Sequence, residues 1–302
     1  MSFEVVSGSG GAGGPAVPAS RAADAERLVQ SLTLELASEK IDLPSFPEVA
    51  ARVRKALADE EVDIDDAVRI IAAEPALAAR LLQLANSAAM NTSGKRIADL
   101  RQALSRIGFN MARSAAIAFA MSQLRRAEAY RGLEQPLDEL WQRSAHVAAV
   151  SHVVAHRFTR VNADMALLAG LLQCVGRLYL LTRAARFPGV LADPATFQRI
   201  VASLHPRITQ AILRNWEIAE EVVVAVVASE NHDREHEGAT DLTDVLAVGS
   251  ALASLGPDAR PDDMLFLGMP AARRMKLDAE RCVAALRESH AEIVSLRQAL
   301  GS

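Results

Sequence analysis

The stretch EPALAARLLQLANSA, residues 74–88, decides the fold class. Alanine and leucine fill most of it, and both are strong helix formers. Pro75 suits the first turn of a helix, where its missing N–H group costs little. Asn86 and Ser87 end the apolar run, and their side chains can satisfy the last backbone groups of the helix or shape the turn that follows. The stretch therefore predicts an apolar helix with a polar end.

The rest of the chain continues this pattern in both directions. Half of the 302 residues are apolar, aromatic residues are few, and alternating runs of β-branched residues are hard to find. The one run that resembles a strand is EVVVAVVA, residues 221–228. Its flanks extend it to helical length, so we expect a buried helix there. The sequence predicts an all-α fold.

Capping residues, prolines and glycines divide the chain into helices of ordinary length. Asp63, Asp99 and Asn162 are expected N-caps, Gly108 is an expected helix end, and Gly176 marks a tight passage between two helices. An apolar stripe at steps of three and four residues indicates a core-facing helix after Pro136. A short helix is expected near Met264, and the longer helices are expected at residues 44–57, 63–72, 75–86, 99–108, 110–126, 137–158, 162–173, 194–204, 206–215, 219–230, 243–254 and 278–300.

Composition and charge exclude several classes of protein. A formal net charge of −4 argues against bulk binding of nucleic acid, which needs a strongly basic face. The two cysteines, Cys174 and Cys282, lie far apart and predict no disulfide framework, which suits a reducing cytoplasm. The N-terminus lacks the basic start and apolar run of a signal peptide, and no purely apolar stretch is long enough to span a bilayer. We therefore expect a cytoplasmic protein without nucleic-acid or membrane partners.

Several segments resemble a known family when they are taken in order. LPSFPEVAARV (43–53) is followed by the 74–88 stretch and by DLRQALSRIG (99–108); LWQRSAHVAAV (140–150) is followed by LLAGLLQCVGRLYL (167–180). Their order and spacing resemble the HDOD domain, a relative of the HD metal-dependent phosphohydrolases that is found in bacterial signalling proteins. The resemblance runs from about residue 41 to residue 232.

The resemblance implies a particular organisation of the chain. Residues 1–20, rich in Gly, Ser, Ala and Pro, are expected to form a flexible tail. Residues 21–260 would be the HDOD-like helical domain, with one lobe at about 41–130 and an HD-like lobe at about 136–260. Residues 261–302 would be a C-terminal helical extension, whose last helix we expect to pack back on the domain because most amphipathic helices bury their stripe within the chain. A regulatory role follows from the resemblance as well.

HD hydrolases hold a divalent cation with His and Asp side chains, and the metal activates water and stabilises charge on the phosphate. The family's adjacent His-Asp pair corresponds here to Gln173-Cys174, its early His to Arg143, and its later Asp to a position near Ser250. Gln is a poor ligand for a catalytic transition metal, a lone Cys makes no site, and the permanent charge of Arg repels a cation. All four ligand positions are thus substituted, so we expect no catalysis, no metal and no cofactor.

Other polar residues are weaker candidates for a site. Arg177 and His232 could line the former metal pocket and meet an anion, and Asn86 could reach a ligand, although a salt bridge for Arg177 and a structural role for Asn86 are the simpler interpretations. His152 and His156 share a helix face at a spacing compatible with a metal, but no acidic third ligand is near in sequence, so we expect two partly exposed histidines. The pair formed by His232 and His236 is expected in a solvated loop.

The sequence leaves three functions open. The first is a non-catalytic signalling adaptor that binds a signalling protein of unknown identity, such as a kinase, a response regulator or a cyclic-dinucleotide enzyme. The second is a sensor that holds a nucleotide or cyclic dinucleotide in the former HD pocket, where the arginines supply anion recognition. The third is a divergent metal-dependent phosphohydrolase with relocated ligands.

Overall fold

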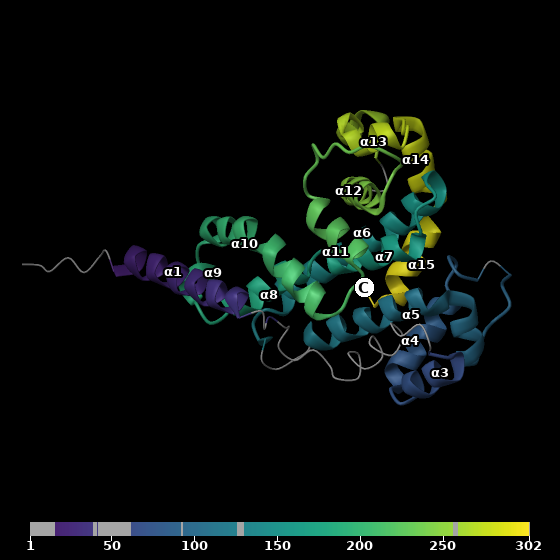
Figure 1. Cartoon of the computed structure of the whole chain (residues 1–302), viewed down its shortest axis with the longest axis horizontal. Coiled ribbons are helices and arrows are strands. Elements are labelled where there is room, and N and C mark those ends of the chain that lie inside the picture. Colours follow the sequence, from purple (N-terminus) through teal and green to yellow (C-terminus); the bar gives the residue numbers. More distant parts are fainter. Residues whose placement is uncertain are drawn as a thin grey trace, which may run out of the picture.

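The computed structural model of the chain describes residues 16–38, 41, 62–91, 93–125, 130–255 and 259–301. Throughout these ranges the regular elements are helices, as the composition predicts (Figure 1). The helix expected over residues 44–57 lies outside the described residues, as do the first 15 residues of the expected tail.

The first group of helices contains the stretch that decides the fold class. Asp63 caps one helix by accepting a hydrogen bond from the Asp66 N–H at 2.7 Å, and Pro75 occupies the first turn of the next, as expected. Gly108 interrupts the third helix with a φ of 72°, a conformation that glycine adopts at little cost. The group consists of α3 (Ile64–Ala72), α4 (Pro75–Ala85) and α5 (Leu100–Arg125).

The centre of the molecule is a set of apolar helices around the long helix α6. Gly170 lets α7 approach α6 closely, because a Cβ atom at this position would lie 2.4 Å from the Cα atom of Ala148. Asn162 caps α7 as expected, with its side-chain oxygen accepting hydrogen bonds from two backbone N–H groups. This set consists of α6 (Glu134–Phe158), α7 (Ala163–Leu172), α8 (Val175–Ala184) and α12 (Leu242–Leu252).

The segment that connects α8 to α12 contains one wrong prediction. Pro206 was expected to separate two helices, but α10 runs without a break from Pro194 to Asn215. Buried residues such as Leu204 and Ile208 continue one apolar stripe across the proline. The carbonyl that the proline leaves without a partner belongs to the exposed Ala202, where water can reach it. The other helices of this segment are α9 (Pro188–Leu191) and α11 (Glu220–Ala228), the latter being the helix expected from EVVVAVVA.

The N-terminal helix α1 (Ala16–Ala37) begins inside the segment that was expected to be a flexible tail. It lies against α9 and α10, far from α3 and α4 (Figure 1). Asp24 accepts a hydrogen bond from the Gly189 N–H at 3.0 Å, and Glu35 bonds to the hydroxyl of Tyr179. Leu28 and Leu32 of α1 are buried in the core, so packing against the rest of the domain stabilises this helix.

The C-terminal extension is helical, but its long helix is divided into two. The apolar stripe expected over residues 278–300 skips a turn at Ser289 and His290, and the chain bends there. The bend lets the two halves bury their apolar sides against different neighbours. The extension comprises η2 (Pro261–Asp263), η3 (Leu265–Gly268), α13 (Pro270–Arg274), α14 (Ala279–Glu288) and α15 (His290–Ala299).

Helix α15 packs back on the domain, as expected, and lies between α4 and α6 (Figure 1). Arg80 of α4 donates a hydrogen bond to the Leu300 carbonyl at 2.9 Å, and Ser295 accepts one from the Ala88 N–H at 2.9 Å. The extension therefore connects the first helical group to the central one.

Among the described residues, one helical run, Ala163–Ala184, is long and apolar enough to cross a membrane when judged by length and composition only. It comprises α7 and α8, and 83% of its apolar window is buried inside the fold. Such burial is typical of the core helices of a folded domain.

Candidate functional site

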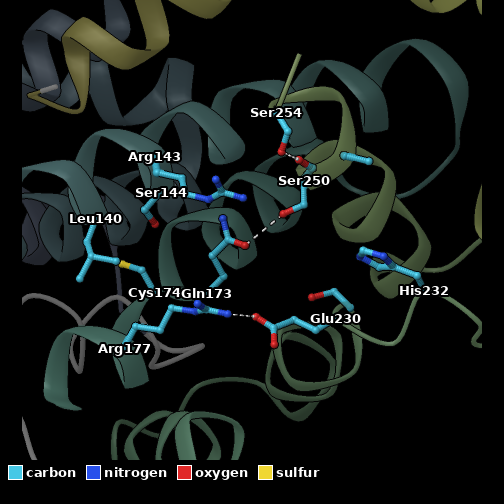
Figure 2. Close-up of a pocket in the computed structure, with 12 residues that line it drawn as sticks. Leu140, Arg143, Ser144, Gln173, Cys174, Arg177, Glu230, His232, Ser250 and Ser254 are labelled. Atoms are coloured by element: carbon cyan, nitrogen blue, oxygen red, sulfur yellow. Dashed lines mark hydrogen bonds and ion pairs between the residues drawn. The ribbon is translucent and has the colours of Figure 1, made fainter. Parts of the chain in front are cut away.

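A cavity of about 520 Å³ opens beside the junction of α7 and α8, and we call it the junction pocket (Figure 2). The central helix α6 forms one wall, α12 forms another, and the residues after α11 close a third side. The pocket is lined by Leu140, Arg143, Ser144, Gln173, Cys174, Arg177, Ser229, Glu230, His232, Ser250, Ala251 and Ser254.

The four positions that the resemblance assigns to metal ligands meet around this pocket. Gln173 ends α7 and Cys174 begins α8, so the junction places both residues at the pocket wall. Arg143 comes from α6 and Ser250 from α12. The Ser250 hydroxyl donates a hydrogen bond to the side-chain oxygen of Gln173 at 3.2 Å (Figure 2).

Buried hydrogen bonds hold the junction against α6. The Ser144 hydroxyl lies 3.0 Å from the Gly170 carbonyl oxygen and 2.8 Å from that of Leu171, so it satisfies the end of α7. Burial raises the pKa of the neighbouring Cys174 thiol, which also contacts the Leu171 carbonyl. The thiol therefore stays protonated and is a poor nucleophile and a poor metal ligand.

An ionic group spans the mouth of the pocket. Arg177 donates to one oxygen of Glu230 at 2.8 Å, and the Nε2 atom of the buried His205 donates to the other at 2.7 Å. These bonds, led by that of His205, lower the pKa of Glu230 to about 2. The salt bridge expected for Arg177 is present, and Glu230 and His205 are partners that sequence spacing did not reveal.

The residues of the junction pocket do not fit a catalytic metal ion. Along the described part of its wall the potential ligands are the imidazole of His232, the carboxylate of Glu230 and the protonated thiol of Cys174. Glu230 already bonds to two basic side chains, and Arg143 adds a further positive charge. A divalent cation would meet too few free donors and an unfavourable field.

The two remaining candidates differ in their positions. His232 is exposed and lines the junction pocket, as expected. Asn86 does not line it. Its Nδ2 atom donates to the carbonyls of Leu82 and Ile97, each at 2.8 Å, and its Oδ1 atom accepts from the Ile97 N–H at 2.8 Å. These bonds support the structural role of Asn86, which is the simpler of the two interpretations, and its role in ligand binding stays a prediction.

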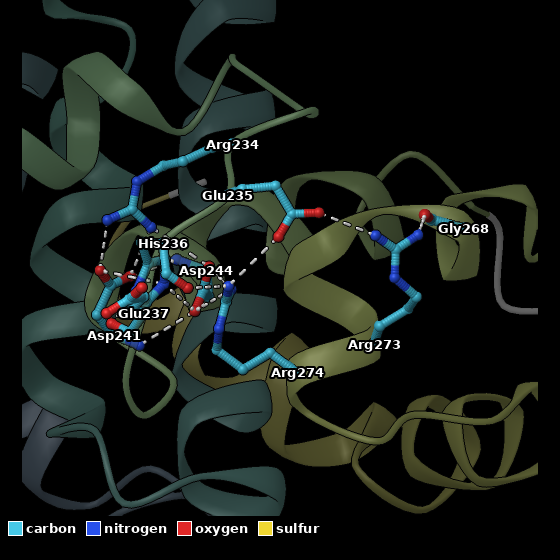
Figure 3. Close-up of polar contacts among 9 residues, drawn as sticks. All are labelled: Arg234, Glu235, His236, Glu237, Asp241, Asp244, Gly268, Arg273 and Arg274. Carbon is cyan, nitrogen blue, oxygen red and sulfur yellow. Dashed lines mark hydrogen bonds and ion pairs between the residues drawn. The ribbon is translucent and has the colours of Figure 1, made fainter.

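The loop after α11 was expected to be solvated, but ionic contacts hold its His236 side chain in place. Its Nε2 atom lies 3.0 Å from the carboxylate of Asp244, which is only 2% exposed (Figure 3). Arg234 bonds to Asp241 at 2.6 Å, and Arg274 of α13 reaches Asp244 at 3.1 Å. This ionic network fixes the loop and α13 to the start of α12. In the sequence, the spacing of Asp241 and Asp244, which form a capping box, was the signal that could have pointed to this network.

His236, Asp241 and Asp244 also place three potential metal ligands within 4.8 Å of one another. The guanidinium groups of Arg234 and Arg274 already bond to these carboxylates (Figure 3). Two fixed positive charges occupy the place that a cation would take, so the cluster is an internal ionic network.

His152 is a further departure from the sequence prediction, which expected a partly exposed side chain. The residue is buried between α7 and α15, while His156 one turn later is exposed. Asp164 and Glu292 are the nearest acidic groups. Glu292 comes from a helix 140 positions away in sequence, which is why local spacing could not reveal it.

The described residues form an all-helical fold with a polar pocket at a helix junction. The HDOD domain family matches residues 43–232, close to the range of the resemblance. The chain is therefore a member of the HDOD family.

Solved structures share the fold. A protein of Shewanella amazonensis, provisionally named a metal-dependent phosphohydrolase, has a TM-score of 0.68 at 24% identity and covers 91% of this chain and 99% of its own. An HDOD domain protein of unknown function from Geobacter sulfurreducens has a TM-score of 0.59 at 22% identity. The match covers 91% of this chain and 97% of the Geobacter chain. A protein of Marinobacter aquaeolei, provisionally named a signal transduction protein, has a TM-score of 0.58 at 18% identity. The match covers 93% of this chain and 66% of the Marinobacter chain. No curated protein matches the sequence significantly.

Proposed function

We propose that this HDOD protein is a non-catalytic signal-transduction module that acts in the cytoplasm by binding another signalling protein. The observation that carries the proposal is the composition of the junction pocket. Arg143, Gln173, Cys174 and Ser250, at the positions that the resemblance assigns to metal ligands, all line it.

The chemistry of these four side chains supports the loss of catalysis. HD-type hydrolysis depends on a metal that lowers the pKa of water and neutralises phosphate charge. A permanent guanidinium charge, an amide, a protonated thiol and a hydroxyl do not hold such an ion. A regulatory domain of this kind acts through the surfaces and pockets that it presents to its partners.

Hydrolysis assays on the full chain test the proposal. Purified protein is supplied in turn with Mg²⁺, Mn²⁺, Ni²⁺ and Zn²⁺ and with phosphomonoester, cyclic-nucleotide and cyclic-dinucleotide substrates. We expect no turnover above the level of the buffer. Metal-dependent turnover that is abolished by Arg143→Ala or Gln173→Ala would establish a divergent hydrolase and overturn the proposal.

Restoring the ligands gives a sharper form of the test. A variant that carries Arg143→His, Gln173→His, Cys174→Asp and Ser250→Asp should gain metal binding at the junction pocket, measured by calorimetry. The control carries Leu140→His instead of Arg143→His, which places the same imidazole on the pocket wall but leaves the arginine in place. Equal metal binding by both variants would show that the four positions are not the degenerate site.

Affinity capture from lysate of the source cells addresses the adaptor function itself. Reproducible enrichment of one signalling protein, lost on charge substitution of an exposed apolar residue such as Leu34 or Leu265, would identify a partner and the face that it uses. Arg143→Ala is the matched variant for the pocket. Retained capture in this variant would place the partner on the outer surface.

A second candidate function is the binding of an anionic ligand such as a nucleotide or a cyclic dinucleotide. The guanidinium of Arg143 has no hydrogen bond or ion pair to any residue that the structure describes, and it lines both the junction pocket and an adjoining apolar cavity of about 310 Å³. Phe197 and Leu181 belong to that second cavity. A phosphate beside Arg143 and an apolar group beside Phe197 would suit this arrangement.

Calorimetry with a panel of nucleotides tests the sensor. Binding that falls at least tenfold in Arg143→Ala and is unchanged in Arg199→Ala, an exposed arginine of α10, would support it. No heat at millimolar nucleotide would remove the sensor and leave the adaptor.

A further inference from the structure

The C-terminal part of α6 carries two histidines whose surroundings are built from distant parts of the chain. His152 and His156 lie one turn apart on α6, and their rings stack with 6.4 Å between centroids. Glu292 reaches the same place from α15, and Asp164 reaches it from the first turn of α7. The group lies nine residues beyond Arg143, about 13 Å along the helix axis, so it is separate from the junction pocket.

His152 is a buried side chain that lies between two carboxylates. Only 8% of the side chain is exposed, and its Nδ1 atom is buried without a hydrogen-bond partner among the described residues. The Glu292 carboxylate lies 3.6 Å from this nitrogen, a distance typical of an ion pair and longer than an ordinary hydrogen bond. Two ligands of a tetrahedral zinc ion lie about 3.4 Å apart, because each metal–ligand bond is about 2.1 Å long. The separation between Nδ1 and the carboxylate is thus that of two ligands on one ion.

The other face of the same imidazole has a carboxylate as well. The Nε2 atom of His152 lies 3.9 Å from Asp164, whose pKa is raised by burial and lowered in part by the histidine. Metal-binding histidines characteristically direct their second nitrogen toward a carboxylate, which fixes the ring and strengthens the ligand. Asp164 lies on the side of the ring where such an orienting group is found, at a distance that is longer than a hydrogen bond.

A third ligand and an entry path come from a neighbouring cleft of about 470 Å³. His156 and Glu292 both line it, so the site opens to solvent on this side. His152, His156 and Glu292 are not among the described residues whose ligand atoms already lie within 4.8 Å of one another, so the exposed His156 side chain has to turn toward Glu292 for the site to form. Histidines four residues apart on one helix face are a recurrent pair of metal ligands. The cationic neighbours are already engaged, since Arg157 pairs with Glu288 at 2.8 Å and Arg281 lies over the Phe158 ring.

We propose that His152, His156 and Glu292 bind a divalent transition-metal ion of the zinc class, with Asp164 orienting His152. The ion ties α15 to the end of α6 and so strengthens the attachment of the C-terminal extension. Two imidazoles and one carboxylate leave a fourth position for water or for a side chain of a partner protein.

Zinc titration of the untagged full chain tests this site. We expect calorimetry to show one Zn²⁺ per chain and thermal unfolding to move to higher temperature with one equivalent of the ion. His156→Ala and Glu292→Gln remove ligands at positions that are at least partly exposed, and each should weaken binding more than tenfold. Asp164→Asn should weaken it about tenfold to a hundredfold, as is typical of orienting carboxylates.

Matched controls separate this site from other histidines. His290→Gln changes an exposed histidine at the start of α15, and it should leave both the affinity and the thermal shift unchanged. Circular dichroism and the melting temperature of each metal-free variant establish that it is folded. Absence of zinc binding by the wild-type chain, or equal binding by wild type, His156→Ala and Glu292→Gln, would overturn the proposal.

Discussion

At the residue scale, the ionisation of Glu230 depends on neighbours from two helices. His205 of α10 and Arg177 of α8 both donate to its carboxylate, and their bonds lower its pKa from the usual 4.5 to about 2. A carboxylate with a depressed pKa stabilises the fold fully above its ordinary pKa. The contribution is lost as the pH falls from about 4.5 toward 2.

Glu230→Gln should therefore destabilise the protein in a pH-dependent manner. The carboxylate is half exposed, so we expect a loss of only about 1 kcal/mol in the free energy of unfolding at pH 7. The difference from wild type should shrink toward zero near pH 2. Urea denaturation at pH 7, 4 and 2.5 measures it, with Glu26→Gln as the exposed control. A difference that stays constant across these pH values would contradict the role of the charge.

Gly176 is the second residue whose role is set by its surroundings. A Cβ atom there would lie 2.2 Å from the Thr209 hydroxyl and 2.6 Å from the His205 carbonyl oxygen. The tight passage expected at Gly176 is thus a contact between α8 and α10. The absence of a side chain is what allows the two helices to approach.

Gly176→Ala should lower the free energy of unfolding by about 1–3 kcal/mol, because the backbone of α10 has to move to accept the methyl group. Gly268→Ala is the matched control, since nothing lies within 4 Å of its added Cβ atom. The control should stay within about 0.5 kcal/mol of wild type. Equal midpoints for the two variants in urea would show that α10 yields freely at this contact.

At the scale of elements, the ionic network holds α13 against α12. Arg274 and its neighbour Arg273 both form ion pairs, but in different surroundings. Arg274 reaches the buried Asp244, whereas Arg273 pairs with the exposed Glu235. Removing Arg274 takes a charge-assisted hydrogen bond from the buried Asp244, although Arg234 and His236 remain beside it. An exposed pair contributes less because solvent weakens it.

Arg274→Leu should cost about 2 kcal/mol of stability and increase hydrogen exchange in α13 and α14. Arg273→Leu, one position away, should cost at most about 1 kcal/mol. Urea denaturation and hydrogen exchange of the pair of variants measure both effects. Similar losses from the two substitutions would show that the buried carboxylate does not depend on Arg274.

At the scale of the whole molecule, α15 holds the first helical group against the central one. Leu296 is fully buried where α15 meets its neighbours, and Arg80 of α4 bonds to the backbone just after α15. The extension is therefore part of the structural core and not an independent tail. Its removal would expose apolar surface on both helical groups.

Leu296→Ala should lower the free energy of unfolding by about 2–5 kcal/mol, the usual cost of a cavity in a core. Leu265→Ala is the control, because Leu265 is 88% exposed, and it should change stability by less than about 0.5 kcal/mol. Thermal and urea unfolding report both values. The Leu296 variant should lose all of its helical signal in one transition, because the first helical group and the central one share this contact. A separate early transition would show that the extension unfolds alone.

Much of the architecture could be predicted from local chemistry. Pro75, Asp63 and Asn162 define helix starts because capping involves only residues a few positions apart. The helix at 221–228 followed from its length and flanks. The break at Ser289 and the continuous helix through Pro206 were missed, because both depend on which side of the helix the rest of the protein covers.

The amino-acid sequence by itself determined the all-helical class and the HDOD resemblance, because both depend on residue type and order along the chain. Only the tertiary structure brought Arg143, Gln173, Cys174 and Ser250 around one pocket. It also supplied the distant partners of the ionic groups, such as Glu292 beside His152. The physical reason is that helix formation depends on near neighbours, whereas a site depends on side chains that only packing brings together.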